Sequence, residues 1–339
     1  PAVVRSAAPP VGASGAPRSG LRTALLGAGA FGRGILWPAF AAAGLVPLRL
    51  VTATGPSAAE TARKLGFARH GTSADEALAD PDVDVVVIAT PHDTHAELVA
   101  RALDAGKHVF AEKPLAVDDA GLDRVVTALG EARGLLGVGF NRRSSPAARR
   151  AGAFLSGAAG PTVITYRVNA GPAPDAGWLA DAARSGGRLV GEACHMIDLA
   201  TFLAGERPVR VAAAGTRSLV ADGAEDDVSL TLAMSGGSLV TVVYHATGDP
   251  ASPKERIEAV RGDRLVVIDD FRGVLESRDG KAVRTKLAAD KGHAAGARAF
   301  VDAVRAGGPP PIPYEDLVAV TRATFAARRS LESGRFEVV

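Results

Sequence analysis

The stretch GAGAFG, Gly27–Gly32, follows a short apolar run, Thr23–Leu26, and opens a stretch with helical periodicity. A G-x-G-x-x-G motif between a strand and a helix is the context in which this motif binds a dinucleotide. Its glycines allow a tight turn and close approach of a pyrophosphate, and the helix N-terminus supplies backbone N–H groups and a positive dipole end. The motif predicts a cofactor site that includes Gly27, Gly29, Ala30, Phe31 and Gly32.

Apolar runs and helical stretches continue to alternate after this motif. The further predicted strands are Leu48–Thr52, Val83–Ala89, Lys107–Ala111 and Leu135–Gly139. Val83–Ala89 is almost continuously apolar and rich in branched residues, as expected of a central strand buried on both faces. Five strands separated by helices and joined by right-handed crossovers predict an α/β fold with a doubly wound parallel (Rossmann) sheet.

The pattern changes after Asn141 to alternating or β-rich runs with few helices between them, which predicts an α+β domain with a large, mostly antiparallel open sheet. The predicted strands are 162–168, 209–215, 228–234, 239–245, 256–260 and 265–269, and helical periodicity returns in 147–155, 193–203, 293–306 and 315–331. Residues 1–20, rich in Ala, Pro, Gly and Ser, predict a disordered tail or linker. We therefore expect a tail at 1–20, a Rossmann domain at 21–141 and an α+β domain at 142–339.

The composition of the 339 residues excludes several classes of protein. Lys and Arg number 39 against 37 Asp and Glu, so the formal net charge of +2 gives no dominant field for nucleic acid or an anionic membrane. No apolar run approaches the ~20 residues of a membrane helix. The single cysteine, Cys194, forms neither an internal disulfide nor a multi-cysteine zinc site. We expect a cytoplasmic protein with a small-molecule substrate and no nucleic-acid or membrane partner.

The end of the second strand bears on the choice of cofactor. An acidic residue about 20 residues after the glycine motif usually holds the adenosine ribose, but here the chain continues TATGPS at Thr52–Ser57. Without a carboxylate a 2′-phosphate is not repelled, and Thr54, Gly55 and Ser57 are the predicted contacts. The choice between NAD and NADP stays open.

Two polar segments follow predicted strands at the edge where a doubly wound sheet binds its ligands. The first is TPHDTH, Thr90–His95, and the second is the end of AGKHVFAEKPL, Ala105–Leu115, in which Glu112–Leu115 follow the strand Lys107–Ala111. Lys113 stands at the end of a strand and can face a nicotinamide there. His92 and His95 have a spacing that occurs in metal sites, but only one carboxylate lies beside them, so we expect no metal.

Residues 21–145 and 161–204 resemble the glucose-fructose oxidoreductase, inositol dehydrogenase and rhizopine-catabolism (Gfo/Idh/MocA) family. The resemblance rests on AGKHVFAEKP, Ala105–Pro114, and GFNRRSSP, Gly139–Pro146. It implies NAD(P)-linked oxidation or reduction of sugars and cyclitols, and a C-terminal domain that binds substrate and forms homodimers or homotetramers through its open sheet. It also implies that Lys113 contacts substrate and cofactor. The further cofactor contacts that it implies are Thr90, Pro91, His92, His95, Glu112 and Pro114.

GGRLVGEACHMIDL, Gly186–Leu199, resembles the second catalytic segment of this family, in which a histidine faces the substrate hydroxyl. Hydride transfer from a carbinol requires the hydroxyl proton to leave, and a histidine, with an unperturbed pKa of about 6.5, suits that task. We assign proton transfer to His195 and stabilisation of alkoxide charge to Lys113. Many relatives have an Asp four positions before the histidine, where this chain has Gly191. Glu192, one place later, either orients His195 or is a buried structural carboxylate.

Other polar residues are candidate substrate contacts, and each is equally explained by packing or by ion pairing. They are Arg142, Arg143, Asn169, Trp178 and Arg188. The runs Asn169–Pro172 and Gly191–His195 resemble the branch of the family that also occurs fused behind a zinc-alcohol-dehydrogenase-like domain, and residues 1–20 suit such a junction.

We therefore expect an NAD(P)-dependent oxidoreductase that acts on a secondary hydroxyl or ketone of a sugar, cyclitol or sugar conjugate. One alternative is a non-catalytic NAD(P)-binding sensor of the same fold, against which the presence of both Lys113 and His195 argues. Another is a reductase of imines or non-sugar carbonyls, which the glycine at position 191 leaves open.

Overall fold

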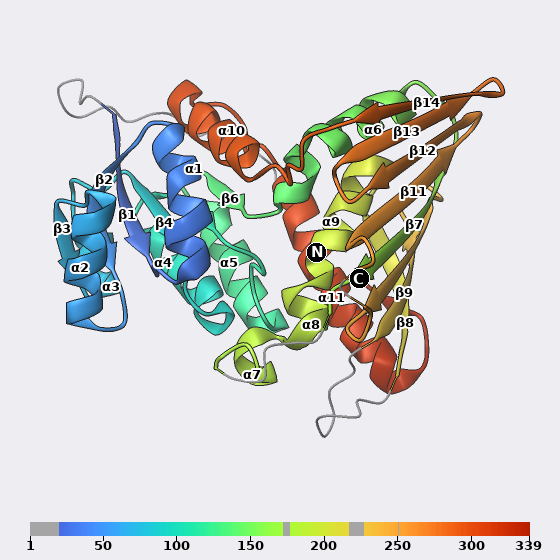
Figure 1. The fold of residues 1–339 in the computed structure, drawn as a ribbon. Helices are drawn as coiled ribbons and strands as arrows, with labels where there is room; N and C mark the ends of the chain where they lie inside the picture. Colours follow the sequence, from blue (N-terminus) through green and yellow to red (C-terminus); the bar gives the residue numbers. More distant parts are fainter. Residues whose placement is uncertain (1–19, 172–176, 217–226, 250) are drawn as a thin grey trace. The chain divides into compact units, whose positions relative to one another are not determined.

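The computed structural model describes residues 20–171, 177–216, 227–249 and 251–339 (Figure 1). The described residues divide into two compact units, one within the bounds Pro1–Gly139 and His293–Leu317, the other within Phe140–Gly292 and Val318–Val339. Of the predicted tail at 1–20, all but the last residue lies outside the described residues, as does Pro172.

The N-terminal unit contains a six-stranded parallel sheet with the order β3-β2-β1-β4-β5-β6. Its strands are β1 (Leu21–Leu26), β2 (Leu45–Val51), β3 (Arg69–Gly71), β4 (Val85–Ile88), β5 (His108–Ala111) and β6 (Leu136–Val138). The order confirms the predicted doubly wound sheet. The sequence reading missed β3, which has three residues, two of them exposed, and whose sequence RHG carries no apolar pattern.

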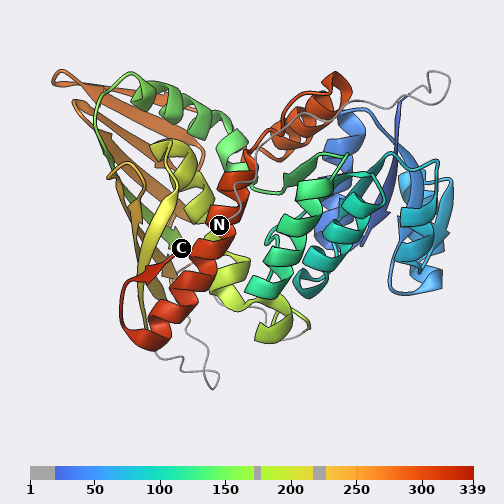
Figure 2. The same ribbon diagram turned by 180° about the vertical axis from the view of Figure 1, so that it is seen from behind.

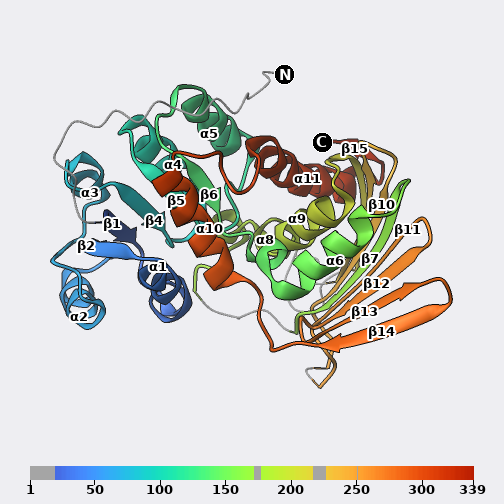
Figure 3. The same cartoon turned by 90° about the horizontal axis from the view of Figure 1, so that it is seen from above.

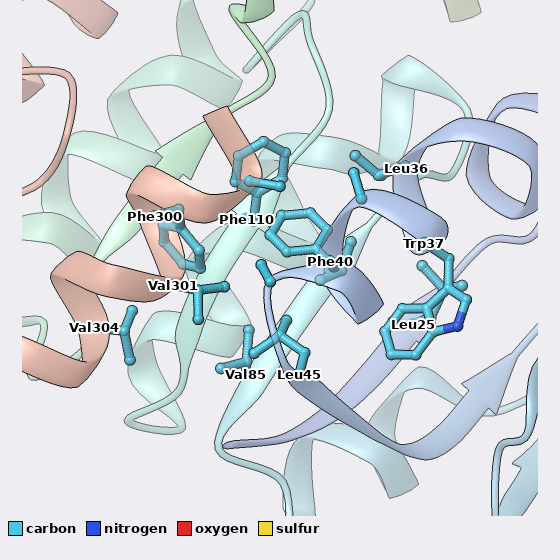
Figure 4. Close-up of a cluster of buried hydrophobic side chains, with 14 of the residues drawn as sticks. Leu25, Leu36, Trp37, Phe40, Leu45, Val85, Phe110, Phe300, Val301 and Val304 are labelled. Atoms are coloured by element: carbon cyan, nitrogen blue, oxygen red, sulfur yellow. The ribbon is translucent and has the colours of Figure 1, made fainter. Parts of the chain in front are cut away.

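Helices cover both faces of this sheet (Figure 2). They are η1 (Gly32–Leu36), α1 (Trp37–Ala42), α2 (Gly55–Leu65), α3 (Ala74–Ala79), η2 (His92–Thr94), α4 (His95–Asp104), α5 (Asp119–Glu131) and α10 (His293–Ala306). Helices α1 and α10 lie on one face, and α4 and α5 lie on the other. Figure 4 shows the core under α1 and α10, where Phe40, Phe110 and Phe300 meet edge to face at centroid distances of 4.8 to 6.3 Å.

The position of α10 differs from the sequence expectation, which assigned all of 142–339 to the second domain. This helix buries Phe300 and Val301 in the core of the N-terminal unit. Arg298 donates to the carbonyl of Ala42, and Arg305 to the carbonyls of Ala43 and Gly44, at the end of α1. A helix with one apolar face joins whichever core accepts that face, and its position along the chain does not decide this.

The C-terminal unit is built on a nine-stranded sheet with the order β14-β13-β12-β11-β7-β10-β9-β8-β15. Its strands are β7 (Thr162–Asn169), β8 (Pro208–Gly215), β9 (Val228–Met234), β10 (Leu239–His245), β11 (Glu255–Arg261), β12 (Arg264–Asp269), β13 (Gly273–Arg278), β14 (Lys281–Lys286) and β15 (Glu337–Val338). Only β7 and β10 pair in parallel, so the predicted, mostly antiparallel sheet is confirmed. The three strands not predicted, β13, β14 and β15, lie at or next to the edges of the sheet.

The helices of this unit are η3 (Asn141–Ser144), α6 (Pro146–Ser156), α7 (Ala182–Ser185), α8 (Gly187–Gly191) and α9 (Ala193–Ala204), joined by the C-terminal part of α11 (Tyr314–Ser333). Helices α6, α9 and α11 lie against one face of the sheet (Figure 3). The opposite face carries no helix among the described residues, and its side chains are partly exposed along β7 and β10.

Candidate functional site

The glycine motif forms the turn from β1 into the first helix. Gly27 has a φ of +87°, and a Cβ placed on it would lie 2.4 Å from the carbonyl oxygen of Ala89, so only glycine fits there. A Cβ on Gly32 would lie 3.1 Å from the Gly27 carbonyl oxygen, whereas a Cβ on Gly29 would meet no atom within 4 Å. Gly27 and Gly32 are therefore required by the close packing of the turn, whereas the space next to the Cα of Gly29 is empty of protein atoms.

This turn fits a dinucleotide phosphate. Gly29, Ala30 and Phe31 are exposed at the start of helical structure that runs from Ala30 to Ala42. Backbone N–H groups at a helix N-terminus attract a phosphate, and open space over the middle glycine lets it approach the backbone. Three of the predicted cofactor residues of this motif, Gly29, Ala30 and Phe31, thus lie together on the surface, whereas Gly32 is buried.

The residues that follow β2 are also exposed to solvent. Thr54 is the N-cap of α2, Gly55 is its first residue, and Ser57 lies in its first turn; all three are exposed. The first turn of α2 carries no acidic side chain. The structure therefore places two hydroxyl groups at a helix N-terminus where a ribose or its 2′-phosphate is expected.

The segment after β4 is held by its own hydrogen bonds. The hydroxyl of Thr94 donates to the carbonyl of Pro91 and lies 2.7 Å from the hydroxyl of Thr90. His92 is buried, and its ring lies 5.6 Å from that of His95. Thr90 and Pro91 are half-buried and lie at the carboxyl edge of the sheet.

His95 belongs to the segment that the family resemblance places along the cofactor, and its side chain lies between two main-chain carbonyl groups. The ring is fully buried at the start of α4. Its Nδ1 lies 2.8 Å from the carbonyl oxygen of Pro114 and its Nε2 lies 2.9 Å from that of Thr90. Because main-chain carbonyls occupy both ring nitrogens, the side chain supports these two segments.

Lys113 follows β5 at the same edge of the sheet and is half-buried. Burial lowers the pKa of His95, and the positive charge of Lys113 lowers it further. Glu112 precedes Lys113. Its main-chain N–H donates to the carbonyl of Ile88, and its carboxylate oxygen Oε1 lies 2.6 Å from the position that a Cβ on Gly139 would take. Glu112 therefore packs against the end of β6.

In the C-terminal unit, His195 lies in the first turn of α9 and is 6% exposed. Its ring packs edge-on against Phe140, with centroids 6.3 Å apart. The main-chain N–H of His195 donates to the carbonyl of Glu192, the N-cap of the helix. The charge of Glu192 contributes to the raised pKa of Arg142, so this carboxylate lies within electrostatic reach of that guanidinium.

Arg142 and Arg143, expected to contact substrate, are instead buried in ion pairs. Arg142 donates two hydrogen bonds to Glu255, at 2.7 and 3.0 Å. Arg143 donates to the carboxylate of Asp198. A buried guanidinium needs a carboxylate partner, and a chelating pair leaves little of it for a ligand. The structure therefore gives both arginines the ion-pairing role that was the stated alternative, and a contact with substrate stays a prediction.

Two further candidate substrate residues, Asn169 and Arg188, lie near the carboxyl end of β7. Asn169 is buried and donates to the carbonyl of Asp249, at 2.6 Å. Arg188 is half-buried, donates to the hydroxyl of Tyr244 and to the carbonyl of Gly171, and stacks over the Tyr244 ring. Trp178 is half-buried. Asn169 and Arg188 thus lie on neighbouring segments of one edge of this unit.

Sequence reasoning missed the buried polar group around Glu255. This carboxylate accepts from Arg142, from Lys291 at 2.6 Å and from the hydroxyl of Tyr166. Burial opposes its ionisation, but the charges and hydrogen bonds of Arg142 and Lys291 outweigh that effect and lower the pKa of Glu255 to about 2. No local pattern marks this group, because 113 residues separate Arg142 from Glu255.

Within the described residues, no cluster of three or more His, Cys, Asp and Glu side chains is arranged to hold a metal ion. Among the helices in the described part of the chain, none is long and apolar enough to cross a membrane.

A doubly wound sheet with an open glycine turn is the arrangement of a dinucleotide-binding domain, and here it is joined to a second domain with a large open sheet. Residues 21–140 match the family described as "Oxidoreductase family, NAD-binding Rossmann fold", and residues 156–264 match the GFO/IDH/MocA C-terminal domain. The chain belongs to the Gfo/Idh/MocA oxidoreductase family, with an NAD-binding Rossmann domain.

Named relatives and solved structures support this assignment. Inositol 2-dehydrogenase of Rhizobium meliloti is 32% identical over 281 residues, 80% of each chain. Myo-inositol 2-dehydrogenase of Thermotoga maritima is 28% identical over 297 residues, 81% of this chain and 86% of the relative. The structure of levoglucosan dehydrogenase in complex with NADH and levoglucosan shares the fold, with a TM-score of 0.85 at 23% identity over 94% of this chain and 99% of that one.

Proposed function

We propose that this oxidoreductase transfers hydride between NAD(P) and a secondary hydroxyl or ketone of a sugar, cyclitol or sugar conjugate. The observation that carries the proposal is the placement of Lys113 at the carboxyl edge of the sheet that also presents the open turn at Gly29. Relatives named as inositol dehydrogenases, which match along four fifths of the chain, support a polyol or its ketone as substrate.

The cofactor contacts follow from the exposed residues of the Rossmann domain. Gly29, Ala30 and Phe31 would hold the pyrophosphate, and Thr54 and Ser57 the adenosine ribose. When bound, the nicotinamide supplies the acceptor or donor of hydride. Thr90 and Pro91 lie at the same edge and would contact the nicotinamide half.

His195 is the proposed proton acceptor and donor. Oxidation of a carbinol removes the hydroxyl proton, and reduction returns it, so one group must exchange a proton with that oxygen. A positive charge on Lys113 would stabilise the alkoxide that forms when the proton leaves. Asn169, Trp178 and Arg188 remain proposed substrate contacts, and Glu192 acts either on His195 or on the charge balance around Arg142.

We also propose that the chain forms homodimers or homotetramers through the helix-free face of its nine-stranded sheet. One row of paired positions on that face is apolar: Val163 of β7 pairs with Leu239 of β10 and with Val260 of β11. These three side chains are 53%, 44% and 38% exposed. A contiguous exposed apolar row supports a protein–protein contact.

The test of the proposed reaction is nicotinamide absorbance with NAD and NADP across a panel of sugars, cyclitols and nucleotide sugars. Wild type, Lys113→Ala and His195→Ala are compared, with two exposed residues, Lys281→Ala and His70→Ala, as matched controls. We expect both site variants to lose turnover while still binding NADH. Binding without turnover of any panel member in either direction would favour a sensor, and turnover of imines alone would favour an imine reductase.

A further inference from the structure

His95 connects two segments that leave neighbouring strands. Strands β4 and β5 pair in parallel, with Ile88 opposite Ala111, and the N–H of Glu112 donates to the carbonyl of Ile88. The pairing of the two strands ends there. The ring of His95 then bridges them, because one nitrogen lies 2.9 Å from the carbonyl of Thr90 and the other 2.8 Å from the carbonyl of Pro114.

The bridge is held inside the domain. His95 has no exposed surface, and Leu115 and Ala116, which follow Pro114, are also fully buried. A neutral imidazole donates to one of the two carbonyls and a protonated one to both. Burial lowers the pKa of His95, the two carbonyls act in the opposite direction, and the charge of Lys113 lowers it further. Rotation of the buried ring would break its contacts with the carbonyls of Pro114 and Thr90.

Pro114 is the residue directly after Lys113, and Thr90 begins the segment proposed to contact the nicotinamide. We propose that His95 is a positioning residue, whose ring fixes the main chain at Pro114 and so holds Lys113 in register with the segment at Thr90. This inference rests on the proposed role of Lys113. Displacing a reacting group by about 1 Å can cost about 100-fold in rate, so the position of the Lys113 main chain matters for turnover.

Three substitutions separate the two halves of the bridge. In His95→Asn the amide N–H takes the place of Nδ1 and can still donate to Pro114. In His95→Gln it takes the place of Nε2 and can still donate to Thr90, and His95→Leu keeps neither contact. We expect the Leu and Gln variants to lose about 10- to 100-fold in kcat, with little change in the Kd for NADH, and the Asn variant to recover most of that loss.

A second measurement does not depend on turnover. Hydrogen–deuterium exchange of the segment 112–116 in the cofactor-free full chain should quicken in His95→Gln and His95→Leu and stay near the wild-type rate in His95→Asn. His108→Leu is the control: His108 begins β5 at the opposite end of the strand, its Nδ1 accepts from the N–H of Leu135, and leucine removes that acceptor. That variant should lower Tm without lowering kcat.

The outcomes distinguish this inference from the proposed function. Wild-type kcat in Lys113→Ala would overturn the proposed role of Lys113, while the exchange data would still report on the bridge. Loss of kcat in Lys113→Ala, together with equal kcat and equal exchange in His95→Asn and His95→Gln, would overturn the positioning role and leave the proposed function standing.

Discussion

Arg142 and Glu255 form a bidentate ion pair inside the C-terminal unit, with Nε and Nη2 of the arginine donating to the two carboxylate oxygens. The Glu255 side chain is fully buried, and that of Arg142 is 7% exposed. Lys291 and Tyr166 complete the surroundings of the carboxylate. The pair connects η3 to the start of β11. Arg142 therefore stabilises the packing of these two elements.

Replacing Arg142 by leucine should destabilise the chain by about 3 to 5 kcal/mol, because removing one partner leaves a buried charge uncompensated. Urea unfolding measures the loss. The control is Arg150→Leu, whose pair with Glu276 is 43% exposed on the arginine side and should matter by about 1 kcal/mol or less. Equal losses in both variants, with a raised KM in Arg142→Leu, would return Arg142 to substrate binding.

The same pair should make stability depend on acid. The pKa of Glu255 is lowered from 4.5 to about 2 in the folded chain. Its contribution, about 3 kcal/mol, is therefore complete above pH ~4.5 and is lost as the pH falls toward 2. Unfolding free energies measured across that window should fall less steeply in Glu255→Gln than in wild type. Glu258→Gln, exposed on the same strand, should follow the wild-type curve, and parallel curves for all three proteins would contradict the assignment.

Gly27 and Gly29 should respond differently to alanine. Gly27→Ala forces a side chain into a positive φ and against the carbonyl of Ala89, so we expect a lower Tm. Gly29→Ala meets open space in the structure and should keep its Tm, but its methyl group would occupy the place proposed for the pyrophosphate. Titration with NADH, followed by fluorescence, should show a raised Kd for Gly29→Ala. An unchanged Kd would contradict the proposal that the pyrophosphate binds at this turn.

The exposed hydroxyl of Thr54 should influence the choice between NAD and NADP. A carboxylate in Thr54→Asp would repel a 2′-phosphate, and like charges at close range cost several kcal/mol. We expect the ratio of KM for NADP to KM for NAD to rise at least about tenfold, equivalent to about 1.4 kcal/mol. Thr54→Asn is the neutral control of the same size as Asp. If the two variants share one ratio, the ribose lies elsewhere.

A charge on the open sheet face should disrupt assembly. Val163→Lys and Leu239→Lys place charges on paired positions of the apolar row. Light scattering coupled to size exclusion should show a smaller particle than in wild type. Val283→Lys, on edge strand β14 and 58% exposed, is the control and should leave the mass unchanged. A constant mass in all variants would place any assembly on another surface.

Several features followed from the sequence by itself because they depend on local pattern. Apolar runs and helical periodicity gave five of the six Rossmann strands and six strands of the second sheet, and the glycine motif gave the turn after β1. Burial on both faces makes a central parallel strand continuously apolar, as in β4. A strict turn geometry makes glycine obligatory at position 27. The family resemblance added Lys113 and His195, whose chemical roles remain predictions.

The tertiary structure alone decided the partners of buried charges and the placement of elements with weak patterns. In the sequence, Arg142 and Arg143 fitted ligand contacts and ion pairs equally well, and the structure shows that carboxylates 113 and 55 residues away are their partners. Helix α10 returned to the N-terminal core, and β3 and β15 were defined by pairing at sheet edges. In each case the deciding free energy comes from contacts between segments that are distant in the sequence. A buried charge needs a partner of opposite charge, and an apolar face needs a core to pack against, so local sequence does not specify either contact.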